Sequence, residues 1–273
     1  WVEGGQYLSP DGTSSFTLPN NTEFPAWILD KYGKYQLSEE YKWSCDDFGR
    51  SQDVEKTFPY QDFVREYMNY DTPYRGVLLY YGLGSGKTRA ALEIARAYRQ
   101  DLGWEVIFIS PAALVDNFVE EMGKWGLIPK DEANRVISLK GRTSRVAALK
   151  ALGYYIVSYD APNKGAQLRQ ALEAGQTEGS SPRIRNKVII VDEVHNMSQF
   201  IHNGINQRQS SAKRERAQEF YNILYGATNC RFVFLSGSPV TNVPSELAIP
   251  FNILRGPMRY RPRPENIKNP AVL

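Results

Sequence analysis

The stretch Gly76-Val-Leu-Leu-Tyr-Tyr-Gly-Leu-Gly-Ser-Gly-Lys-Thr88 runs from an apolar segment through a glycine-rich turn into Lys-Thr. The apolar segment predicts a buried strand at 76–81, and the apolar residues that follow at helical spacing predict a helix at 87–100. A strand, a glycine-rich turn and a helix in this order are the context of a P-loop. Such a loop points backbone N–H groups at phosphate oxygens, and the helix N-terminus adds a partial positive charge.

This loop offers backbone, ammonium and hydroxyl groups to a nucleotide. Its predicted phosphate-binding residues are Gly82, Gly84, Ser85, Gly86, Lys87 and Thr88. The ammonium of Lys87 can reach the β- and γ-phosphates, and the hydroxyl of Thr88 can ligate magnesium. The strict pattern has glycine where this chain has Tyr81, so the loop fits the variant with glycines at 82, 84 and 86. The alternative is a glycine-rich turn that binds no ligand.

A second apolar segment, Lys187-Val-Ile-Ile-Val191, is followed by two acids, Asp192 and Glu193. A strand that is apolar throughout is buried on both faces, so its end places both carboxylates at the edge of a sheet. Asp192 can then hold magnesium through water, and Glu193 can polarise the water that attacks a phosphate. Acids also cap strands that carry no site. Together with the P-loop, however, the pair predicts ATP hydrolysis with Lys87, Asp192 and Glu193 as the catalytic residues.

From about residue 58 the chain alternates short apolar segments with amphipathic ones. Further strands are expected at 105–109, 135–139, 154–158 and 231–235, and helices at 60–69 and 112–125. Apolar strands separated by helical stretches imply right-handed crossovers between parallel strands. The fold class that follows is a doubly wound α/β domain, a mainly parallel sheet flanked by helices.

Changes in composition divide the chain into three parts. Residues 1–57 are rich in Gly, Pro, Ser, Asn and Asp and predict an irregular lead-in, with one aromatic patch at 24–29. Residues 58–255 form the predicted α/β domain. Residues 256–273 are rich in Pro and Arg, which predicts a linker or an extended arm, because proline cannot continue a helix or a central strand.

Overall composition is that of an ordinary soluble globular protein, with 42% hydrophobic and 23% charged residues. No apolar run approaches the ~20 residues that cross a bilayer, so no membrane association is expected. The two cysteines, Cys45 and Cys230, are far apart with no histidine cluster nearby, which argues against a zinc site or a disulfide framework and fits an intracellular location. The formal net charge of +3 permits a polyanionic partner without demanding one.

Two further motifs resemble those of a known group of proteins. Asp192-Glu-Val-His195 has the DExH form, and Leu235-Ser-Gly-Ser-Pro-Val-Thr-Asn242 resembles the element after the fifth core strand of superfamily 2 helicases. With the P-loop, they resemble motifs I, II and III of that superfamily in the correct order. The resemblance is closest to the large-DNA-virus group that contains the poxvirus nucleoside triphosphatase I and the small subunit of the poxvirus early transcription factor. It rests there on the stretches 72–88, 110–117 and 241–247.

The resemblance implies a RecA-like fold for the α/β domain and roles for residues outside the P-loop and the acid pair. Gln61 matches a glutamine that reads adenine, although a glutamine on a surface helix is also unremarkable. Ser110 and Pro111 match a motif that touches the nucleic-acid backbone, although a simple strand end explains them too. Coupling of nucleotide state to domain movement is implied for His195, Ser236, Ser238 and Thr241. For His195 the alternative is a histidine satisfied at an interface.

By the same resemblance we predict that the chain is the ATP-binding lobe of a nucleic-acid-dependent ATPase, a helicase or translocase that uses ATP and Mg²⁺. The implied partners are nucleic acid, with DNA favoured over RNA, a second RecA-like lobe, and RNA polymerase or other transcription or virion proteins. For a viral protein, the implied location is the virion and the host cytoplasm. No strand–helix series follows Leu247, so the second lobe is expected to lie outside this chain and the chain alone to hydrolyse ATP poorly.

Two questions stay open at this level. The basic stretch Arg208 to Arg216 falls between motifs II and III, where it either contacts phosphates or a partner protein or is a solvated helix face. The second question is whether the protein is a motor or a nucleotide-dependent switch or structural subunit of a transcription or virion assembly. The resemblance implies an arginine finger on the second lobe, and its absence from this chain favours the switch, whereas the intact Lys87, Thr88 and acid pair favour the motor.

Overall fold

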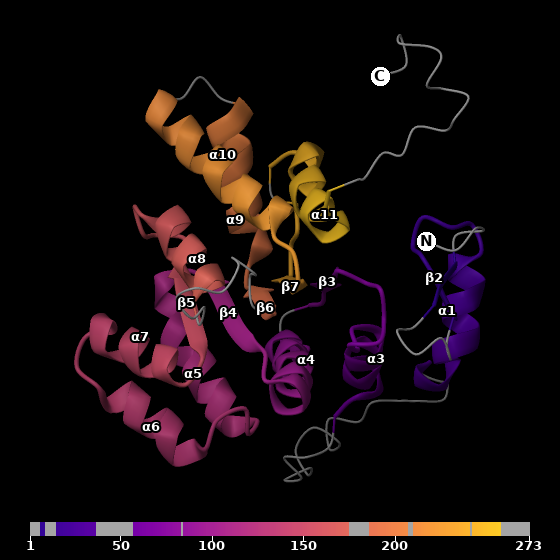
Figure 1. The fold of residues 1–273 in the computed structure, drawn as a ribbon, viewed down its shortest axis with the longest axis horizontal. Helices are drawn as coiled ribbons and strands as arrows, with labels where there is room; N and C mark the ends of the chain where they lie inside the picture. The colour runs from indigo at the N-terminus through magenta and orange to yellow at the C-terminus, as the bar shows by residue number, and fades with distance from the viewer. Residues whose placement is uncertain are drawn as a thin grey trace, which may run out of the picture.

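The computed structural model describes residues 6–8, 15–36, 57–82, 84–174, 186–206, 210–240 and 242–257. Its centre is a five-stranded, all-parallel sheet in the order β3-β7-β6-β4-β5. The strands are β3 (Gly76–Tyr80), β4 (Glu105–Ser110), β5 (Tyr154–Ser158), β6 (Lys187–Val191) and β7 (Cys230–Ser236). Figure 1 shows helices on both faces of this sheet. The predicted fold class, a mainly parallel sheet flanked by helices, is confirmed.

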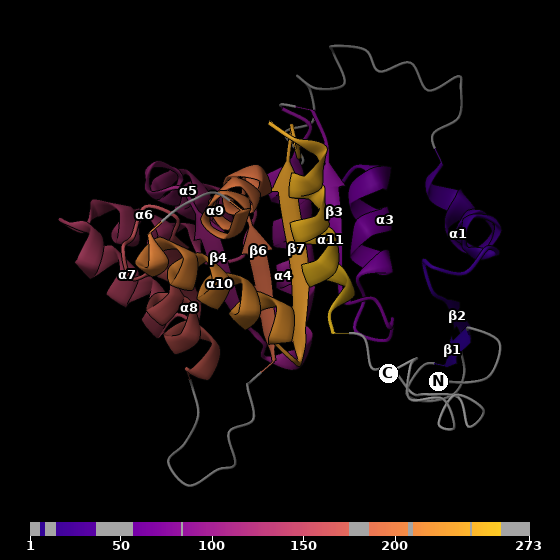
Figure 2. The same cartoon turned by 90° about the horizontal axis from the view of Figure 1, so that it is seen from above.

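The helices form two layers. One face of the sheet carries α3 (Pro59–Tyr67), α4 (Lys87–Leu102), α5 (Val115–Lys124), α6 (Lys130–Ser138) and α7 (Arg142–Ala151). The other face carries α8 (Lys164–Glu173), α9 (Val194–Asn206), α10 (Ser211–Gly226) and α11 (Ala248–Arg255). Figure 2 shows α10 and α11 in front of the strands and α4 behind them.

Side chains alternate between the two layers along each strand. In β4, Val106 and Phe108 belong to the core under α4 and α5, whereas Ile107 and Ile109 belong to the core under α9 and α10. All four are at most 2% exposed. Because both faces are covered, the strands are apolar throughout and do not alternate with polar residues.

Residues 135–139, predicted as a strand, lie instead at the end of α6 and just after it. Ala133 and Val136 are buried at helical spacing, and the acids of the first turn suit a helix N-terminus. Gly123 of α5 makes room for this helix, because a Cβ there would lie 2.5 Å from the Cβ of Ala133. The apolar window was too short for its period to separate strand from helix.

The lead-in predicted as irregular contains regular structure in its described part. An antiparallel pair joins β1 (Gln6–Leu8) to β2 (Ser15–Thr17), and α1 spans Phe24–Tyr32. The Tyr32 ring meets the ring of Phe63 on α3 edge-on, with the centroids 5.4 Å apart. Aromatic contacts thereby attach this segment to α3, which the composition of the lead-in did not indicate.

The described chain ends just beyond α11, which packs beside β3. Arg75, before β3, donates a hydrogen bond from Nε to the carbonyl of Ile253 in α11 at 2.9 Å. The predicted linker, 256–273, lies outside the described residues except for its first two. Within the described ranges, no helix is long and apolar enough to cross a membrane.

A buried ion pair at the start of β6 provides a test of this fold. Lys187 is 0% exposed, forms a salt bridge with Glu105, and donates a hydrogen bond to the carbonyl of Ala174 at 3.1 Å. Loss of one partner leaves the other charge uncompensated, so we expect Lys187→Ala to lower the free energy of unfolding by about 3 kcal/mol. Urea denaturation measures this, with exposed Lys130→Ala as the control. Equal stability of the two variants would contradict the prediction.

Candidate nucleotide-binding site

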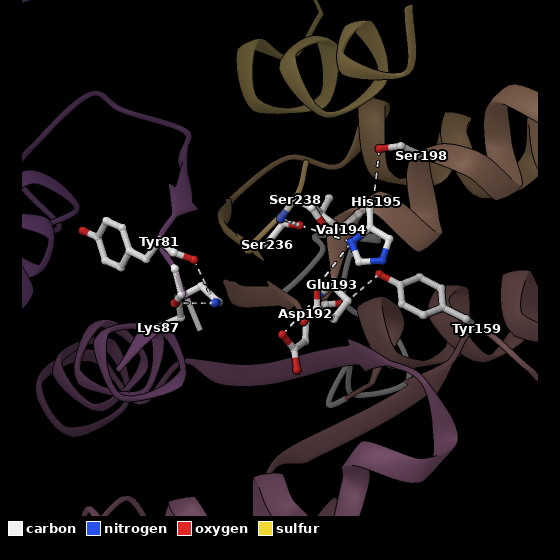
Figure 3. Close-up of polar contacts among 11 residues, drawn as sticks. Tyr81, Lys87, Tyr159, Asp192, Glu193, Val194, His195, Ser198, Ser236 and Ser238 are labelled. Carbon is white, nitrogen blue, oxygen red and sulfur yellow. Dashed lines mark hydrogen bonds and ion pairs between the residues drawn. The ribbon is translucent and has the colours of Figure 1, made fainter. Parts of the chain in front are cut away.

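The glycine-rich loop lies at the carboxyl edge of the sheet, between β3 and α4. Gly84 (φ 75°) and Gly86 (φ 77°) have left-handed backbone conformations, which cost a residue with a side chain about 1–2 kcal/mol. The Nζ of Lys87 donates hydrogen bonds to the carbonyl oxygens of Tyr81 (2.9 Å) and Gly82 (3.1 Å), as Figure 3 shows. These two hydrogen bonds hold the lysine across the loop. A bound phosphate would replace the two carbonyls as its partner.

Two side chains of helix α3 donate hydrogen bonds to this loop. Gln61 is 1% exposed, and its Nε2 donates to the carbonyl of Gly86 at 3.3 Å while its Oε1 accepts from the backbone N–H of Phe58 at 3.0 Å. The hydroxyl of Tyr60 donates to the carbonyl of Ser85 at 2.6 Å. Both ends of the Gln61 amide are thus engaged by the protein itself. Its predicted contact with adenine stays a prediction.

The acid pair follows β6 directly, in a turn with an unusual backbone. The N–H of Asp192 donates to the carbonyl of Ile109 at 2.9 Å, and Oδ1 of Asp192 accepts from the N–H of Glu193 at 3.0 Å. Glu193 has a φ of 48°, a left-handed conformation that costs a non-glycine residue on the order of 1–3 kcal/mol. Such strain is frequent at functional sites, where surrounding contacts hold the backbone in place.

Electrostatics couple this turn to the P-loop. Burial raises the pKa of Asp192 to about 6, and the neighbouring Glu193 carboxylate raises it as well, whereas the hydrogen bond from the backbone of Glu193 and the charge of Lys87 lower it. The ammonium of Lys87 is thus close enough to lower the pKa of the Asp192 carboxyl, although its hydrogen bonds are to the carbonyls of Tyr81 and Gly82. A carboxylate so weakly compensated is suited to a site that receives further positive charge with its ligand.

His195 connects the acid pair to the turn after β7. Its Nδ1 lies 3.2 Å from Oε2 of Glu193 and 3.2 Å from Oγ of Ser236. That hydroxyl oxygen also accepts the backbone N–H of Ser238 at 3.1 Å (Figure 3). Three of the residues predicted to couple nucleotide state to movement therefore form one chain of contacts with Glu193. The fourth, Thr241, lies outside the described residues.

Tyr159 is not among the residues predicted from the sequence. Its hydroxyl donates to the main-chain carbonyl of Asp192 at 3.3 Å, and its N–H donates to the carbonyl of Ser110 at 3.1 Å. Burial, together with the nearby carboxylates of Asp192 and Glu193, holds the pKa of Tyr159 well above its usual value, so the phenol stays a neutral donor. The only sequence signal was a tyrosine directly after a predicted strand, at the edge where strands end.

Ser110 and Pro111, the predicted nucleic-acid contacts, end β4 at the same edge. Ser110 is 0% exposed and its hydroxyl donates to the carbonyl of Pro111 at 3.1 Å. The following N–H, of Ala112, donates to Oδ2 of Asp160 at 2.9 Å. The structure thus places both residues near the site but leaves only Pro111 partly accessible. Their contact with nucleic acid stays a prediction.

Oxygen donors suited to magnesium lie on both sides of the site. Thr88, in the first turn of α4, has a hydroxyl with no hydrogen-bond partner in the described part of the chain, and Asp192 supplies a carboxylate. Magnesium is usually held by one or two protein oxygens together with phosphates and water. Among the described residues no group of three His, Cys, Asp or Glu side chains could hold a metal by itself. The donor set therefore fits a magnesium ion that arrives with nucleotide phosphates.

Known proteins are similar in sequence to the larger part of this chain. The family model described as type III restriction enzyme, res subunit, matches residues 55–222. A putative ATP-dependent RNA helicase of Acanthamoeba polyphaga mimivirus is 29% identical over 87% of this chain and 28% of that protein. A termination factor NPH-I homolog of African swine fever virus is 28% identical over 88% and 32% of the two chains, and a putative helicase of Frog virus 3 is 28% identical over 80% and 22%. The chain spans about a third or less of the length of these relatives.

The raised pKa of Asp192 predicts a pH-dependent cost in stability. The pKa is about 6 in the folded chain against an ordinary 3.8, so the folded state binds the proton more tightly than the unfolded state. As the pH rises from about 4 to above 6, the ionised carboxylate therefore destabilises the folded state increasingly. We expect Asp192→Asn to raise the free energy of unfolding by about 2–3 kcal/mol at pH 8 and to change it little at pH 4. Urea denaturation at both pH values measures this, with exposed Asp30→Asn as the control. A gain of the same size at both values would contradict the prediction.

The position of Gln61 predicts two separable effects of its removal. Gln61→Ala leaves the N–H of Phe58 and the carbonyl of Gly86 without their partners, so we expect it to loosen the P-loop and weaken ATP and GTP binding alike. A further loss specific to ATP measures the predicted adenine contact. Binding of fluorescent ATP and GTP analogues separates the two, with exposed Gln170→Ala as the control. Equal losses would rule out adenine reading, and unchanged GTP binding would rule out the effect on the loop.

Proposed function

The chain belongs to the family of the type III restriction enzyme res subunit, and on that premise we propose that it is the ATP-binding lobe of a nucleic-acid-dependent ATPase of helicase or translocase type. The resemblance to helicases of large DNA viruses, inferred from the motifs, is confirmed by relatives in mimivirus, African swine fever virus and Frog virus 3. The observation that carries the proposal is the convergence of Lys87, the acid pair and the His195–Ser236 contact at one edge of the sheet.

In the proposed reaction the P-loop binds the triphosphate. The left-handed glycines let loop N–H groups turn toward phosphate oxygens, and Lys87 exchanges its contacts with the carbonyls of Tyr81 and Gly82 for the β- and γ-phosphates. Thr88 and Asp192 would hold magnesium, which when bound neutralises charge on the phosphates. Lys87 thereby replaces two hydrogen bonds to backbone carbonyls with hydrogen bonds to charged phosphate oxygens, which are stronger.

Glu193 is the residue we assign to the attacking water. Its carboxylate lies within 3.2 Å of the His195 ring, which orients it at the end of a strained turn. A carboxylate placed in this way polarises water for in-line attack on the γ-phosphate. Because His195 contacts both Glu193 and Ser236, a shift of Glu193 on loss of the γ-phosphate would also move the turn after β7. This is the DExH role inferred from the motif.

The larger context of the proposal comes from the relatives. Their names include putative helicases and a termination factor NPH-I homolog, and each is more than twice as long as the part that this chain matches. We therefore assign to the complete protein a second RecA-like lobe and a nucleic-acid substrate, with DNA favoured over RNA. Its proposed role is in viral transcription, with RNA polymerase or other transcription or virion proteins as partners. The virion and the host cytoplasm are the corresponding locations.

Hydrolysis measurements test this function. In the complete protein that contains this chain, we expect DNA or RNA to stimulate ATP hydrolysis, and Glu193→Gln to reduce it by roughly 10²–10⁴-fold, the usual contribution of a positioned acid or base. ATP binding should persist in that variant. The exposed Glu120→Gln on α5 is the matched control. Hydrolysis that no nucleic acid stimulates, with intact nucleotide binding, would replace the motor by a nucleotide-dependent switch.

A further inference from the structure

Segment 15–36, which contains β2 and α1, packs against helix α3, the helix that holds the P-loop. Figures 1 and 2 both show α3 between α4 and α1, and α3 contacts α4 directly. The side chains of Phe63, Glu66 and Tyr67 form one stripe along α3, because residues three and four apart lie on the same face of a helix. This stripe is the surface of α3 that the segment covers.

Each residue of the stripe has a partner in the segment. The ring of Tyr32 meets the rings of Phe63 and Tyr67 edge-on, with the centroids 5.4 Å and 6.4 Å apart. The ammonium of Lys34 lies 3.0 Å from Oε1 of Glu66, but both of these side chains are exposed. Exposed ion pairs contribute little to stability, whereas buried aromatic pairs contribute more. The buried Tyr32 therefore provides most of this contact.

Tyr74, two residues before β3, is a second point of attachment. Its hydroxyl donates a buried hydrogen bond to the carbonyl of Thr17 at 2.9 Å. Its ring meets the rings of Phe16 and Trp27 edge-on, with the centroids 6.3 Å apart in both pairs, and it stacks on the ring of Tyr67 at 4.2 Å. The segment is thus joined both to α3 and to the residues that lead into β3.

The position of α3 depends on its neighbours. The helix has nine residues, and a helix shorter than about 12 residues is marginal in water without tertiary packing. Removal of segment 15–36 would uncover the rings of Phe63, Tyr67 and Tyr74, and exposure of large aromatic surface to water is unfavourable. The segment therefore supplies one of the surfaces that keep α3 in place.

The first turn of α3 fixes two peptide groups of the P-loop. The carbonyl of Ser85 accepts the hydroxyl of Tyr60, and the carbonyl of Gly86 accepts Nε2 of Gln61. In a trans peptide the C=O and N–H point in opposite directions, so these bonds direct the N–H groups of Gly86 and Lys87 away from α3. Backbone N–H groups of such a loop surround the phosphate. A shift of α3 therefore reorients two of the groups that receive it.

On the basis of the proposed function, we propose that segment 15–36 is a positioning element of the nucleotide site and that Tyr32 is its principal residue. The segment holds α3, and α3 orients the P-loop toward the triphosphate. The effect extends to any ligand with a phosphate chain, with or without a base, because the fixed peptide groups belong to the phosphate-binding loop. Hydrolysis of bound ATP persists, because the acid pair follows β6, which β7 separates from β3.

Nucleotide binding by variants of the complete protein tests this role. Tyr32→Ala removes the ring, Tyr32→Phe keeps it, and Leu29→Ala, at a 61% exposed position on the same helix, is the matched control. Affinity is measured with a fluorescent ATP analogue and, by competition, with inorganic tripolyphosphate, which has no base. Thermal melting verifies that each variant is folded at the temperature of measurement. If Tyr32→Ala is not folded, Tyr32→Leu, which keeps an apolar side chain, takes its place.

We expect Tyr32→Ala, and neither Tyr32→Phe nor Leu29→Ala, to weaken the binding of both ligands by roughly 3- to 10-fold, about the equilibrium factor of one aromatic pair. KM for ATP should rise by the same factor while kcat changes little, a division that a general loss of stability does not produce. In a Tyr60→Phe/Gln61→Ala background, Tyr32→Ala should have a smaller effect, because the hydrogen bonds that transmit it are already lost.

Three outcomes would overturn the inference while leaving the proposed function intact. Normal affinity of folded Tyr32→Ala for both ligands would reduce the segment to a part of the domain that only stabilises it. An undiminished effect in the Tyr60→Phe/Gln61→Ala background would exclude the route through α3. A loss confined to the ATP analogue would exclude an effect on the phosphate loop. In contrast, an original protein that binds neither ligand would overturn the proposed function and this inference together.

Discussion

Parallel pairing of β3, β7 and β6 is the constraint on which the site depends. The register sets Tyr80 beside Ser236 and Val191 beside Phe234, so all three strands end at one edge within two residues of each other. The P-loop, the acid pair and the Ser236 turn follow these ends, and they come together only because the hydrogen bonds of the sheet hold the ends level. Helices cover both faces of the sheet, so polar side chains that follow the strands reach solvent only at the edges. The candidate site therefore lies at the edge where the P-loop and the acid pair follow their strands.

The fold class was predictable because it depends on a repeated pattern. Strands buried on both faces are apolar throughout, and this pattern located β3, β4, β5, β6 and β7 within a few residues. The incorrect strand at 135–139 shows the limit of that signal: its apolar residues face α5 from a short helix, and a few residues do not reveal a period. The aromatic residues of α1 were visible, but their partners on α3 lie more than thirty residues away in the sequence, so composition alone suggested an irregular segment.

The site divides in the same way. Lys87, Thr88 and the acid pair carry their context beside them in the chain, and the structure brings them to one edge as expected. Tyr159 and the second set of contacts of Gln61 depend on how loops from different strands meet, and no local pattern encodes that. The burial of Ser110 is a further example, since the sequence indicated a strand end but not which way its hydroxyl points. The place of these residues at the sheet edge was thus predictable, and contacts between distant turns were not.

β3 leads into the P-loop and pairs with β7 and with no other strand of the described sheet. A strand at the edge of a sheet leaves a row of its N–H and C=O groups without a ladder partner. Side chains of α11 cover it near Gly76, but they do not replace those hydrogen bonds. Local opening is easiest where the backbone is bonded on one side only. The amide hydrogens of β3 that face away from β7 therefore exchange with water sooner than those of β6 at the centre, and their exchange rate is a label-free report on how tightly a nucleotide holds the loop.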